Sequence, residues 1–319
     1  MLQVGFDIGG TNIKVGVVNE KMEIVASRRE PFPTGEKYEK VADIMEELVR
    51  EMAEELNVTV SEFQSIGIAI PGSLDPECKI ILDAYNLHFH NVPMKQVMEE
   101  RFPGIPVFLG NDANVAALAE LHCGAFVGSK TAVLMTLGTG VGGGLILDGK
   151  MFNGGTGHGV ELGHMVLQEG GERCSCGNRG CVESYCAATW LVRQGRKAVI
   201  EHPLSMIHKR ANGDMKRVTA KLVVDCAKAG DYIAKDIFHL YLGYLSSAIV
   251  SICVLLGPEV IALGGGVSLA GDFLYRPLRK MVNEKSFFKG KNQVVPAKLG
   301  NDAGILGAAM LKWNAEQSK

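Results

Sequence analysis

The chain has 319 residues, and its 33 Lys and Arg nearly balance its 35 Asp and Glu, leaving a formal charge of -2. This balance gives no electrostatic reason to expect nucleic acid or an acidic membrane as a partner. Hydrophobic residues make up 47% and charged residues 21%, which excludes wholesale disorder, and the length predicts two domains. The 39 glycines follow no three-residue period, which excludes a collagen-like chain.

The N-terminal residues predict no targeting signal, because no basic region is followed by an apolar core. We therefore expect a cytoplasmic, reducing location, in which disulfides are rare. The stretch 237–257 has no charged residue and is long enough to cross a bilayer. It carries three serines and continues from an amphipathic stretch at 219–236, so we expect a buried helix and no membrane partner.

The first part of the chain predicts strands followed by a helix. Three short strands are expected over 2–8, 13–19 and 23–29, and an amphipathic helix over 36–57. Apolar runs predict two further strands, at 65–69 and 106–109. A helix that begins at 112–113 would use Asn111 or Asp112 as its cap.

The second part predicts another strand pair and then mainly helix. The pair is expected over 131–137 and 143–147, with later strands near 259–263 and 293–297. Helices are expected over 184–200, 218–256, 271–284 and 303–315. Strands that alternate with helices imply a layered α/β architecture. Segment 7–18 resembles segment 136–147, since each reads strand, Gly/Thr turn, strand, which suits a duplicated fold.

Two familiar glycine fingerprints occur near residue 140, and neither has the helix that its function needs. Gly138 to Gly143 satisfies G-x-G-x-x-G, but a predicted strand follows, so the dinucleotide-binding interpretation fails. Gly144 to Lys150 begins like a P-loop but continues with Met151, which lacks the hydroxyl for Mg²⁺.

Two strand–turn–strand loops remain as candidate phosphate sites: Gly9-Gly10-Thr11-Asn12 and Gly138-Thr139-Gly140. Glycine lets consecutive backbone N–H groups converge on an anion, and the threonine hydroxyl adds a donor. Either loop alone could equally be an ordinary hairpin turn. Two similar loops, the first preceded by Asp7, favour phosphate, and Gly264-Gly265-Gly266 is a third place where a ligand could approach the backbone.

Three of the eight cysteines, Cys174, Cys176 and Cys181, lie within eight residues, and His164 precedes them by ten. A set of three thiolates and one imidazole suits tetrahedral Zn²⁺. Four protein ligands close the coordination sphere, so the metal would be structural. The alternative is a reactive or incidental set of thiols. Three cysteines so close together in a cytosolic chain favour zinc over this alternative. The other five cysteines are expected in the core.

The assembled motifs resemble the ROK family of sugar kinases and repressors, in the actin-like ATPase superfamily, and its bacterial glucokinases most of all. The resemblance runs nearly end to end. It is carried by the following segments: 7–14, Pro71-Gly72, 110–114, Gly138-Thr-Gly with Gly154 and Glu161-Leu-Gly-His164, Cys174-x-Cys-Gly-x-x-Gly-Cys-x-Glu183, and 302–309.

The resemblance implies a two-lobed actin-like ATPase fold, which is ribonuclease H-like, with a duplicated mixed-sheet core. A small N-terminal α/β lobe would comprise 1–110 plus 303–319, and a large α/β lobe with the zinc-binding loop would comprise 111–302. It also implies a homodimer and a cleft that closes on sugar.

The resemblance implies ATP-dependent phosphorylation of a hexose at its 6-hydroxyl, most readily glucose. Asp112 would be the general base, a role compatible with a helix cap. The sugar-binding residues would be Gly72, Asn86, Asn111, Asp112, Glu161, His164 and Glu183. The ATP-binding residues, with Asp7 near Mg²⁺, would be Asp7, Gly9, Gly10, Thr11, Asn12, Lys14, Gly138, Thr139, Gly140, Gly265 and Gly266. The structural Zn²⁺ would be held by His164, Cys174, Cys176 and Cys181.

The sequence departs from the glucokinase pattern in two places. Cys186 replaces a frequent serine, for which we expect only a packing consequence. Segment 87–93 is less glucokinase-like and would lie near the sugar, so N-acetylmannosamine, allose, fructose and mannose stay open as substrates. His88 and His90 in this segment are expected to be ordinary loop residues.

Two other functions compete with the kinase. The family's repressors carry an added DNA-binding segment, for which we expect no room before Asp7. A catalytically silent sugar-binding protein is the other alternative, and the presence of Asp112 counts against it.

Overall fold

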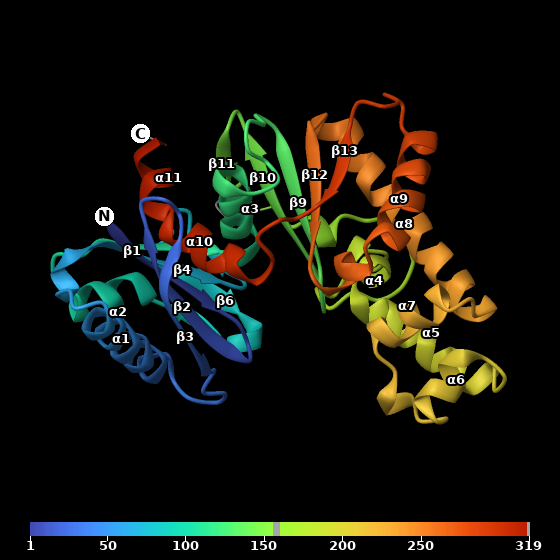
Figure 1. Ribbon diagram of the computed structural model, residues 1–319, viewed down its shortest axis with the longest axis horizontal. Helices are drawn as coiled ribbons and strands as arrows, with labels where there is room; N and C mark the ends of the chain where they lie inside the picture. Colours follow the sequence, from blue (N-terminus) through green and yellow to red (C-terminus); the bar gives the residue numbers. More distant parts are fainter. Residues whose placement is uncertain (156–159, 318–319) are drawn as a thin grey trace. The chain divides into compact units, whose positions relative to one another are not determined.

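The computed structural model describes residues 1–155 and 160–317 (Figure 1). Contacts between residues divide the chain into two compact units. Unit 1 comprises Met1–Lys130, Gly144–Val160 and Lys298–Lys319, and unit 2 comprises Thr131–Gly143 and Glu161–Ala297. The expected lobes, divided at residues 110 and 302, stay a prediction.

Unit 1 is built on a five-stranded mixed sheet. Its strand order is β3-β2-β1-β4-β8. The strands are β1 (Leu2–Ile8), β2 (Asn12–Asn19), β3 (Ile24–Pro31), β4 (Phe63–Ile70) and β8 (Val107–Asn111). The first three pair antiparallel through tight turns, and β4 and β8 add in parallel beside β1. All five were predicted, the first three as short strands joined by turns and the last two from their apolar runs.

The alternation of side chains along β1 gives this sheet two covered faces. Val4, Phe6 and Ile8 point into a core with helices α1 (Tyr38–Glu55) and α2 (Met94–Arg101). The opposite face packs against α10 (Ala303–Ala309), which contacts β1 and β4. The last helix of the described residues is α11 (Leu311–Gln317), so the single helix expected over 303–315 is wrong, because α10 ends before Met310.

Glycines let α10 approach the sheet closely. A Cβ atom on Gly5 would lie 2.9 Å from the backbone nitrogen of Ala309, and one on Gly67 only 2.5 Å from the carbonyl carbon of Ala308. Real Cβ atoms essentially never come within 3.0 Å of such atoms. Any larger side chain at these positions would therefore push the helix away.

Helix α3 (Asp112–Cys123) is tied to the segment that leads into α10. Glu120, which is fully buried, accepts hydrogen bonds from the backbone nitrogens of Ala125 at 2.6 Å, Lys298 at 2.8 Å and Leu299 at 2.9 Å. Three N–H donors solvate this carboxylate in the place of water.

A small antiparallel sheet, which the sequence did not predict, completes unit 1. Its order is β5-β6-β7. The strands are β5 (Ser73–Leu74), β6 (Ile81–Ala84) and β7 (Phe89–Val92). Short 3-10 turns lie at Val60–Glu62, Tyr85–Leu87 and Gly300–Asp302.

The second mixed sheet has the order β11-β10-β9-β12-β13. Its strands are β9 (Ala132–Leu137), β10 (Val141–Leu147), β11 (Lys150–Phe152), β12 (Val260–Gly264) and β13 (Gln293–Pro296). Numbered along the chain within each sheet, both sheets have the order third, second, first, fourth, fifth. This repetition agrees with the predicted duplicated core. Strand β10 follows Gly140 directly, so the two helix-requiring glycine fingerprints are false, as predicted.

The helices of unit 2 follow the predicted stretches, which are broken twice, except for α6, which was not predicted. They are α4 (Val182–Cys186), α5 (Ala188–Glu201), α6 (Met206–Ala211), α7 (Ala220–Lys228), α8 (Tyr232–Leu256) and α9 (Asp272–Lys285), with 3-10 turns at Leu162–His164, Met215–Arg217 and Gly266–Ala270. The single helix expected over 184–200 is wrong, because Ala187 is extended, with ψ 158°. The single helix over 218–256 is also wrong. Gly230 has φ +99° there, and Asp231 caps α8 by accepting from the Ala234 nitrogen at 2.8 Å.

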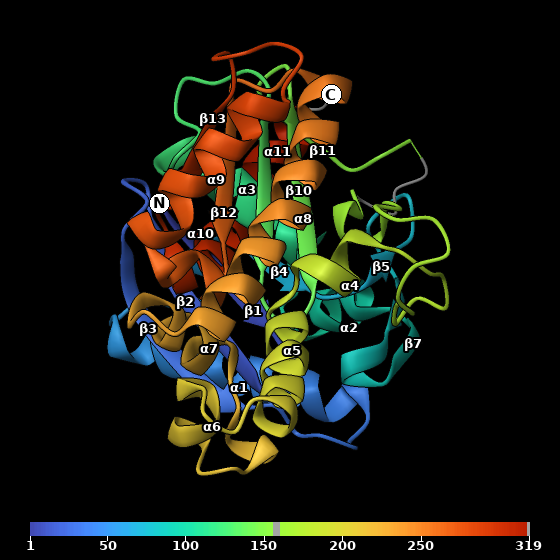
Figure 2. The ribbon, with the colours of Figure 1, turned by 90° about the vertical axis from the view of Figure 1, so that its right-hand side faces the viewer.

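Helix α8 is long and apolar enough to cross a membrane by length and composition. It packs against α7 and α9 within unit 2, and Figure 2 shows α8 and α9 side by side. Tyr241, Leu245 and Ile249 are fully buried along one side of it. This burial is what we expect of a core helix.

Candidate functional site

The predicted site residues fall into two groups, one in each unit, and each group is described within its own unit. In unit 1 the turn from β1 to β2 forms the first glycine loop. The nitrogen of Gly9 donates to the Asn12 oxygen at 2.9 Å, and Asn12 Nδ2 donates to Thr11 Oγ1 at 2.7 Å. A Cβ atom on Gly10 would lie 3.2 Å from the Asn86 oxygen, so the structure brings the loop beside Asn86.

An ion pair lies beside this loop. Lys14 and Asp7 are partners across β1 and β2, and Lys14 Nζ lies 2.7 Å from Asp7 Oδ2. The carboxyl group of Asp7 packs against Gly304, where a Cβ atom would come within 2.6 Å of Asp7 Cγ. One cation and one carboxylate therefore lie next to the predicted phosphate loop.

The end of β8 and the start of α3 form the second part of the unit 1 group. Asn111 caps α3: its Oδ1 accepts from the nitrogens of Ala113 at 3.0 Å and Asn114 at 3.2 Å. Its Nδ2 donates to the Gly72 oxygen at 3.1 Å. Gly72 has φ +109°, and a Cβ atom there would lie 2.9 Å from Ala84 Cα, so only glycine suits the position.

Asp112 is the first residue of α3 and is half-buried. Its Oδ1 accepts from the Ala113 nitrogen at 2.8 Å. The positive end of the helix dipole favours a carboxylate here. Of the two predicted caps Asn111 is the one at the cap position, which places the Asp112 carboxylate in the first helical turn.

In unit 2 the four predicted metal ligands lie together. One donor atom from each of His164, Cys174, Cys176 and Cys181 lies within 4.8 Å of the others. Cys176 Sγ is 3.8 Å from Cys181 Sγ, and Cys174 Sγ is 3.6 Å from His164 Nδ1. A tetrahedral zinc ion with bonds of about 2.3 Å to sulfur and about 2.0 Å to nitrogen requires ligand separations close to these. The donor set therefore fits a tetrahedral soft-ligand metal.

The thiols of this cluster differ in acidity. Burial disfavours the Cys174 thiolate, but hydrogen bonds from Cys176, Cys181 and His164 outweigh it and lower its pKa to about 7. Burial raises the pKa of Cys181 to about 12, and its two neighbouring thiols add to the rise. All eight cysteines are free thiols. Among the other five, Cys186, Cys226 and Cys253 are buried as predicted, and Cys78 and Cys123 are half-buried.

Glu161 and Glu183 lie near the four potential metal ligands. Desolvation raises the pKa of Glu161, the charge of His164 opposes this, and the charge of Glu183 adds to it. Glu183 follows Cys181 in the first turn of α4. Its Oε1 accepts from Ser175 Oγ at 2.8 Å, and its Oε2 accepts from the Val141 nitrogen at 3.1 Å. The structure thus groups both glutamates with His164.

The second glycine loop, 138–140, lies in the same unit. The Gly138 nitrogen donates to the Gly140 oxygen at 3.0 Å, which closes the turn between β9 and β10. Gly265 has φ +81°, and a Cβ atom there would lie 2.7 Å from the Leu137 nitrogen. The structure therefore brings Gly265 against the end of β9, next to this loop.

A cavity of about 530 Å³ adjoins Gly266. Its lining is formed by Ala188, Ala220, Lys221, Val224, Asp225, Lys228, Gly266, Val267, Leu269 and Ala270. Sequence reasoning identified Gly266 but missed the contribution of α7. The amphipathic pattern of α7 indicates only that one face is buried, and gives no sign of what the other face lines.

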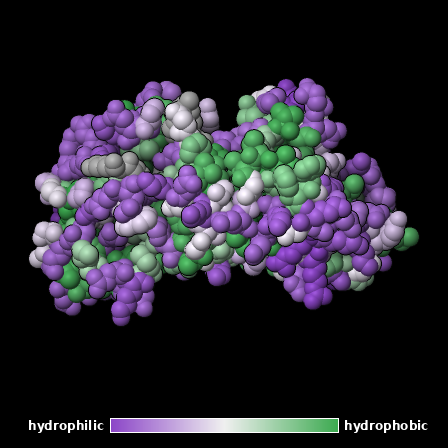
Figure 3. Space-filling view, turned by 90° about the horizontal axis from the view of Figure 1, so that it is seen from above, coloured by the Kyte–Doolittle hydropathy of each residue, from purple (hydrophilic) through white to green (hydrophobic). Residues whose placement is uncertain are grey.

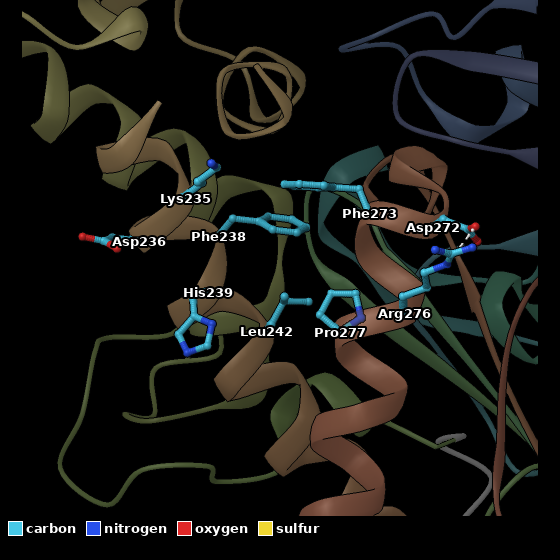
Figure 4. Close-up of a pocket in the computed structure, with 9 residues that line it drawn as sticks. All are labelled: Lys235, Asp236, Phe238, His239, Leu242, Asp272, Phe273, Arg276 and Pro277. Carbon is cyan, nitrogen blue, oxygen red and sulfur yellow. Dashed lines mark ion pairs between the residues drawn. The ribbon is translucent and has the colours of Figure 1, made fainter. Parts of the chain in front are cut away.

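A second cavity in unit 2, of about 670 Å³, lies between α8 and α9 and contains none of the predicted residues. Figure 4 shows Phe238 and Phe273 stacked, and Asp236 directed away from them. Arg276 pairs with Asp272 at 3.2 Å, so these two charges satisfy each other. No convergent set of polar groups marks this cavity as a reaction site.

His88 lies in a loop, as expected, but the loop position expected for His90 is wrong, because His90 lies in strand β7. His90 Nδ1 lies 2.8 Å from Asp83 Oδ1, and its Nε2 lies 3.0 Å from Asn91 Nδ2. His88 has a left-handed backbone, with φ 57°, after the 3-10 turn at Tyr85–Leu87. Among the described residues, neither belongs to a cluster of potential metal ligands.

Comparisons with known proteins agree with this geometry. A family model described as "ROK family" matches residues 3–315. The glucokinase of Thermotoga maritima is 36% identical over 315 residues, which cover 97% of this chain and 96% of that protein. The glucokinase of Halalkalibacterium halodurans is 34% identical over 319 residues, with coverage of 99% and 96%.

A solved structure is also similar. It is the ROK family glucokinase of Streptomyces griseus in complex with glucose and AMPPNP, with a TM-score of 0.82, 32% identity and coverage of 98% and 99% of the two chains. The likeness confirms the predicted α/β fold of the actin-like ATPase type. On the family model and on identity over nearly its full length, the chain belongs to the ROK family.

Proposed function

We propose that this chain is a glucokinase, which transfers the γ-phosphoryl group of ATP to the 6-hydroxyl of glucose. The observation that carries the proposal is Asp112, held in the first turn of α3 by the Asn111 cap. The glucokinase relatives support the choice of reaction, since they are similar over almost the whole chain.

In the proposed mechanism Asp112 accepts the proton of the sugar 6-hydroxyl. The hydroxyl oxygen forms a bond to the γ-phosphorus, the bond from that phosphorus to the bridging oxygen breaks, and ADP leaves with the electron pair. Because the carboxylate takes up a proton as the oxygen attacks, no alkoxide has to form beforehand. Mg²⁺ bound with ATP neutralises phosphate charge, and Asp7 is the carboxylate we assign beside it.

The remaining polar residues would hold the two substrates. Amide and carboxylate groups each pair with adjacent hydroxyls of a pyranose, which suits Asn86, Asn111, Glu161, His164 and Glu183, with Gly72 giving backbone access. The glycine loops 9–12 and 138–140 would donate N–H groups to phosphate. Gly265 and Gly266 would receive the nucleoside, and the adjoining cavity of about 530 Å³ has room for a base.

We propose that the metal is zinc and that it is structural, because four protein ligands leave no open position for substrate. Bound through His164 Nδ1, it would fix the ring and leave Nε2 for a sugar hydroxyl. Elemental analysis of the purified protein should give one zinc per chain, and Cys176→Ala should lose it. Well below one equivalent in the folded wild type would contradict the assignment.

The direct test is a coupled assay with glucose and ATP·Mg. Asp112→Asn keeps an oxygen to accept from the Ala113 nitrogen, so the helix start is preserved while the base is lost. We expect kcat to fall by roughly 10²- to 10⁴-fold. The matched control is Asp148→Asn, which also removes one carboxylate but lies in a turn, where Asp148 has φ +51°. It should leave kcat unchanged.

No turnover on any hexose would refute the kinase, and an Asp112→Asn variant equal to wild type would refute the role of Asp112 as the general base. Binding of glucose without turnover would instead favour a silent sugar-binding protein. A panel at fixed ATP, with N-acetylmannosamine, allose, fructose and mannose beside glucose, tests the choice of hexose. A higher kcat/KM for one of these would overturn glucose while leaving the reaction in place.

We also propose that the enzyme is a cytoplasmic homodimer. Apolar side chains that stay exposed in unit 2 support an interface there, among them Val254, Leu255, Phe287 and Phe288. Figure 3 shows hydrophobic residues gathered on one face of the molecule. Light scattering coupled to size exclusion should give twice 34.3 kDa. A single chain at micromolar concentration would contradict the dimer.

A further inference from the structure

We propose that Glu183 is a positioning residue that couples the metal-binding loop to the glycine loop 138–141. The proposal rests on the proposed function, in which the glycine loop holds the phosphates of ATP. It adds a role to Glu183 beyond sugar binding: the state of the metal site would set the affinity for nucleotide.

The two oxygens of the Glu183 carboxylate bind different segments of unit 2. Oε2 accepts from the Val141 nitrogen at 3.1 Å, at the point where the glycine loop enters β10. Oε1 accepts from Ser175 Oγ at 2.8 Å. One carboxylate thus bridges two segments that lie more than thirty residues apart in the chain. The Cys174 thiol also donates to Oε1, at 3.7 Å. A carboxylate has about four acceptor sites, so one remains for a sugar hydroxyl.

The fit of this bridge to the glycine loop is close. A Cβ atom on Gly140 would collide with Glu183 Oε2 and lie 3.3 Å from its Cδ. The residues that follow Glu183 add two further ties to the same loop. The Ala188 nitrogen donates to the Gly138 oxygen at 2.8 Å, and Thr189 Oγ1 donates to the Thr139 oxygen at 3.1 Å.

The other end of the bridge lies inside the metal-binding loop. Ser175 stands between two potential ligands, Cys174 and Cys176, so a metal bound to both would fix where its hydroxyl lies. The Cys174 nitrogen donates to the Asn178 oxygen at 2.9 Å, and the Gly177 nitrogen donates to the Cys174 oxygen at 3.1 Å. Residues 175–179 are nevertheless exposed to solvent. Loss of the metal would free Cys174 and Ser175 together, and these are the two residues that contact Glu183 Oε1.

Two sites that share such an element are linked thermodynamically. If the metal favours the loop geometry that binds nucleotide, nucleotide must favour metal binding by the same factor. The coupling would be expressed in nucleotide affinity, so it can be measured without turnover.

The test is calorimetric titration of a non-hydrolysable ATP analogue with Mg²⁺ into the holoenzyme and into chelator-treated protein. In wild type we expect metal removal to weaken binding by about tenfold, a coupling of ordinary size. Ser175→Ala removes the hydroxyl but no metal ligand. It should keep one metal per chain, bind nucleotide several-fold more weakly, and lose most of the dependence on metal.

Ser184→Ala is the matched control. Its hydroxyl also contacts this loop, donating to the Arg173 oxygen at 3.2 Å, but it does not bind Glu183. We expect its nucleotide affinity to equal that of wild type. If the metal-free protein unfolds, the nucleotide affinities of Ser175→Ala and Ser184→Ala in the metal-loaded state still test the coupling.

Equal nucleotide affinity in these two variants, or a Ser175→Ala variant with the full metal dependence of wild type, would overturn the coupling. Failure of wild type itself to bind the ATP analogue would refute the proposed kinase instead. The two failures are therefore distinguishable.

Discussion

Replacement of Gly67 by alanine should destabilise unit 1 strongly, since this position sets the approach of α10 to the sheet. The new Cβ atom would lie 2.5 Å from the carbonyl carbon of Ala308, and the obstacle is backbone and not the tip of a flexible side chain. The Ala308 carbonyl oxygen would lie closer still, so an ordinary contact requires well over 1 Å of added separation between β4 and α10. Overpacking of a core typically costs 1–3 kcal/mol, and rigid backbone on both sides places this variant at about 3 kcal/mol.

The matched control is Gly243→Ala, in the middle of α8. A Cβ atom there has no neighbour within 4 Å, and the helical backbone suits alanine. This variant should be more stable than wild type by about 0.5–1 kcal/mol. One added methyl group is thus expected to lower the free energy of unfolding at Gly67 and to raise it at Gly243.

Urea unfolding followed by tryptophan fluorescence measures both effects. The chain has two tryptophans, Trp190 in unit 2 and Trp313 in unit 1, so a Trp190→Phe background reports on unit 1 alone. Gly243→Ala is compared in the Trp313→Phe background, which reports on unit 2. A Gly67→Ala variant within 1 kcal/mol of its parent would refute the packing argument.

Three further variants test other contacts. Glu120→Ala should destabilise unit 1 by about 3 kcal/mol in urea unfolding, because three buried N–H groups lose their acceptor, and a loss below 1 kcal/mol would contradict this. Asn111→Asp keeps the helix cap but cannot donate to the Gly72 oxygen, so we expect a raised KM for sugar with little change in the melting temperature. An unchanged KM would show that this hydrogen bond does not contribute to sugar binding. Burial lowers the pKa of His122, so the unfolded chain binds a proton there at a higher pH than the folded chain does. The free energy of unfolding should therefore fall as pH drops below about 6.5. His122→Phe can keep the edge contact to Trp313, whose ring centroid lies 4.2 Å from that of His122, and should reduce this fall in urea unfolding at pH 7.5 and 5.5. An equal fall in both proteins would contradict the assignment.

Local patterns predicted much of the fold. The apolar runs at 2–8 and 106–109 form strands because each is long enough to be buried and ends at glycine or a polar residue. The cap of α3 followed from side-chain chemistry, since Asn111 and Asp112 were the two residues able to accept from free N–H groups. The clustering of His164 with Cys174, Cys176 and Cys181 was predicted for a similar reason, because few residue types bind soft metals and four of them lie close in sequence.

What local patterns missed depends on contacts between distant residues. Ala187 interrupts a helical stretch although alanine favours helix, and the next residue, Ala188, donates its N–H to Gly138. Strand β5 has two residues and shows no alternation that could predict it. The bond from Val141 to Glu183 joins residues 42 apart, and no pattern in the sequence indicates which carboxylate a given N–H will meet.

The order in which unit 1 is completed has a consequence for synthesis of the chain. Gly5 and Gly67 leave the ribosome early, but α10, which covers them, is made among the last residues. At a synthesis rate of 5–20 residues per second, the interval between the synthesis of Gly67 and that of α10 lasts roughly 10 to 50 s. During that time one face of the first sheet is a bare glycine-lined surface, open to chaperones and to pairing with another nascent chain. A premature stop before residue 303 would make this exposure permanent, so such truncated chains should be cleared by proteolysis and not accumulate as a smaller folded form.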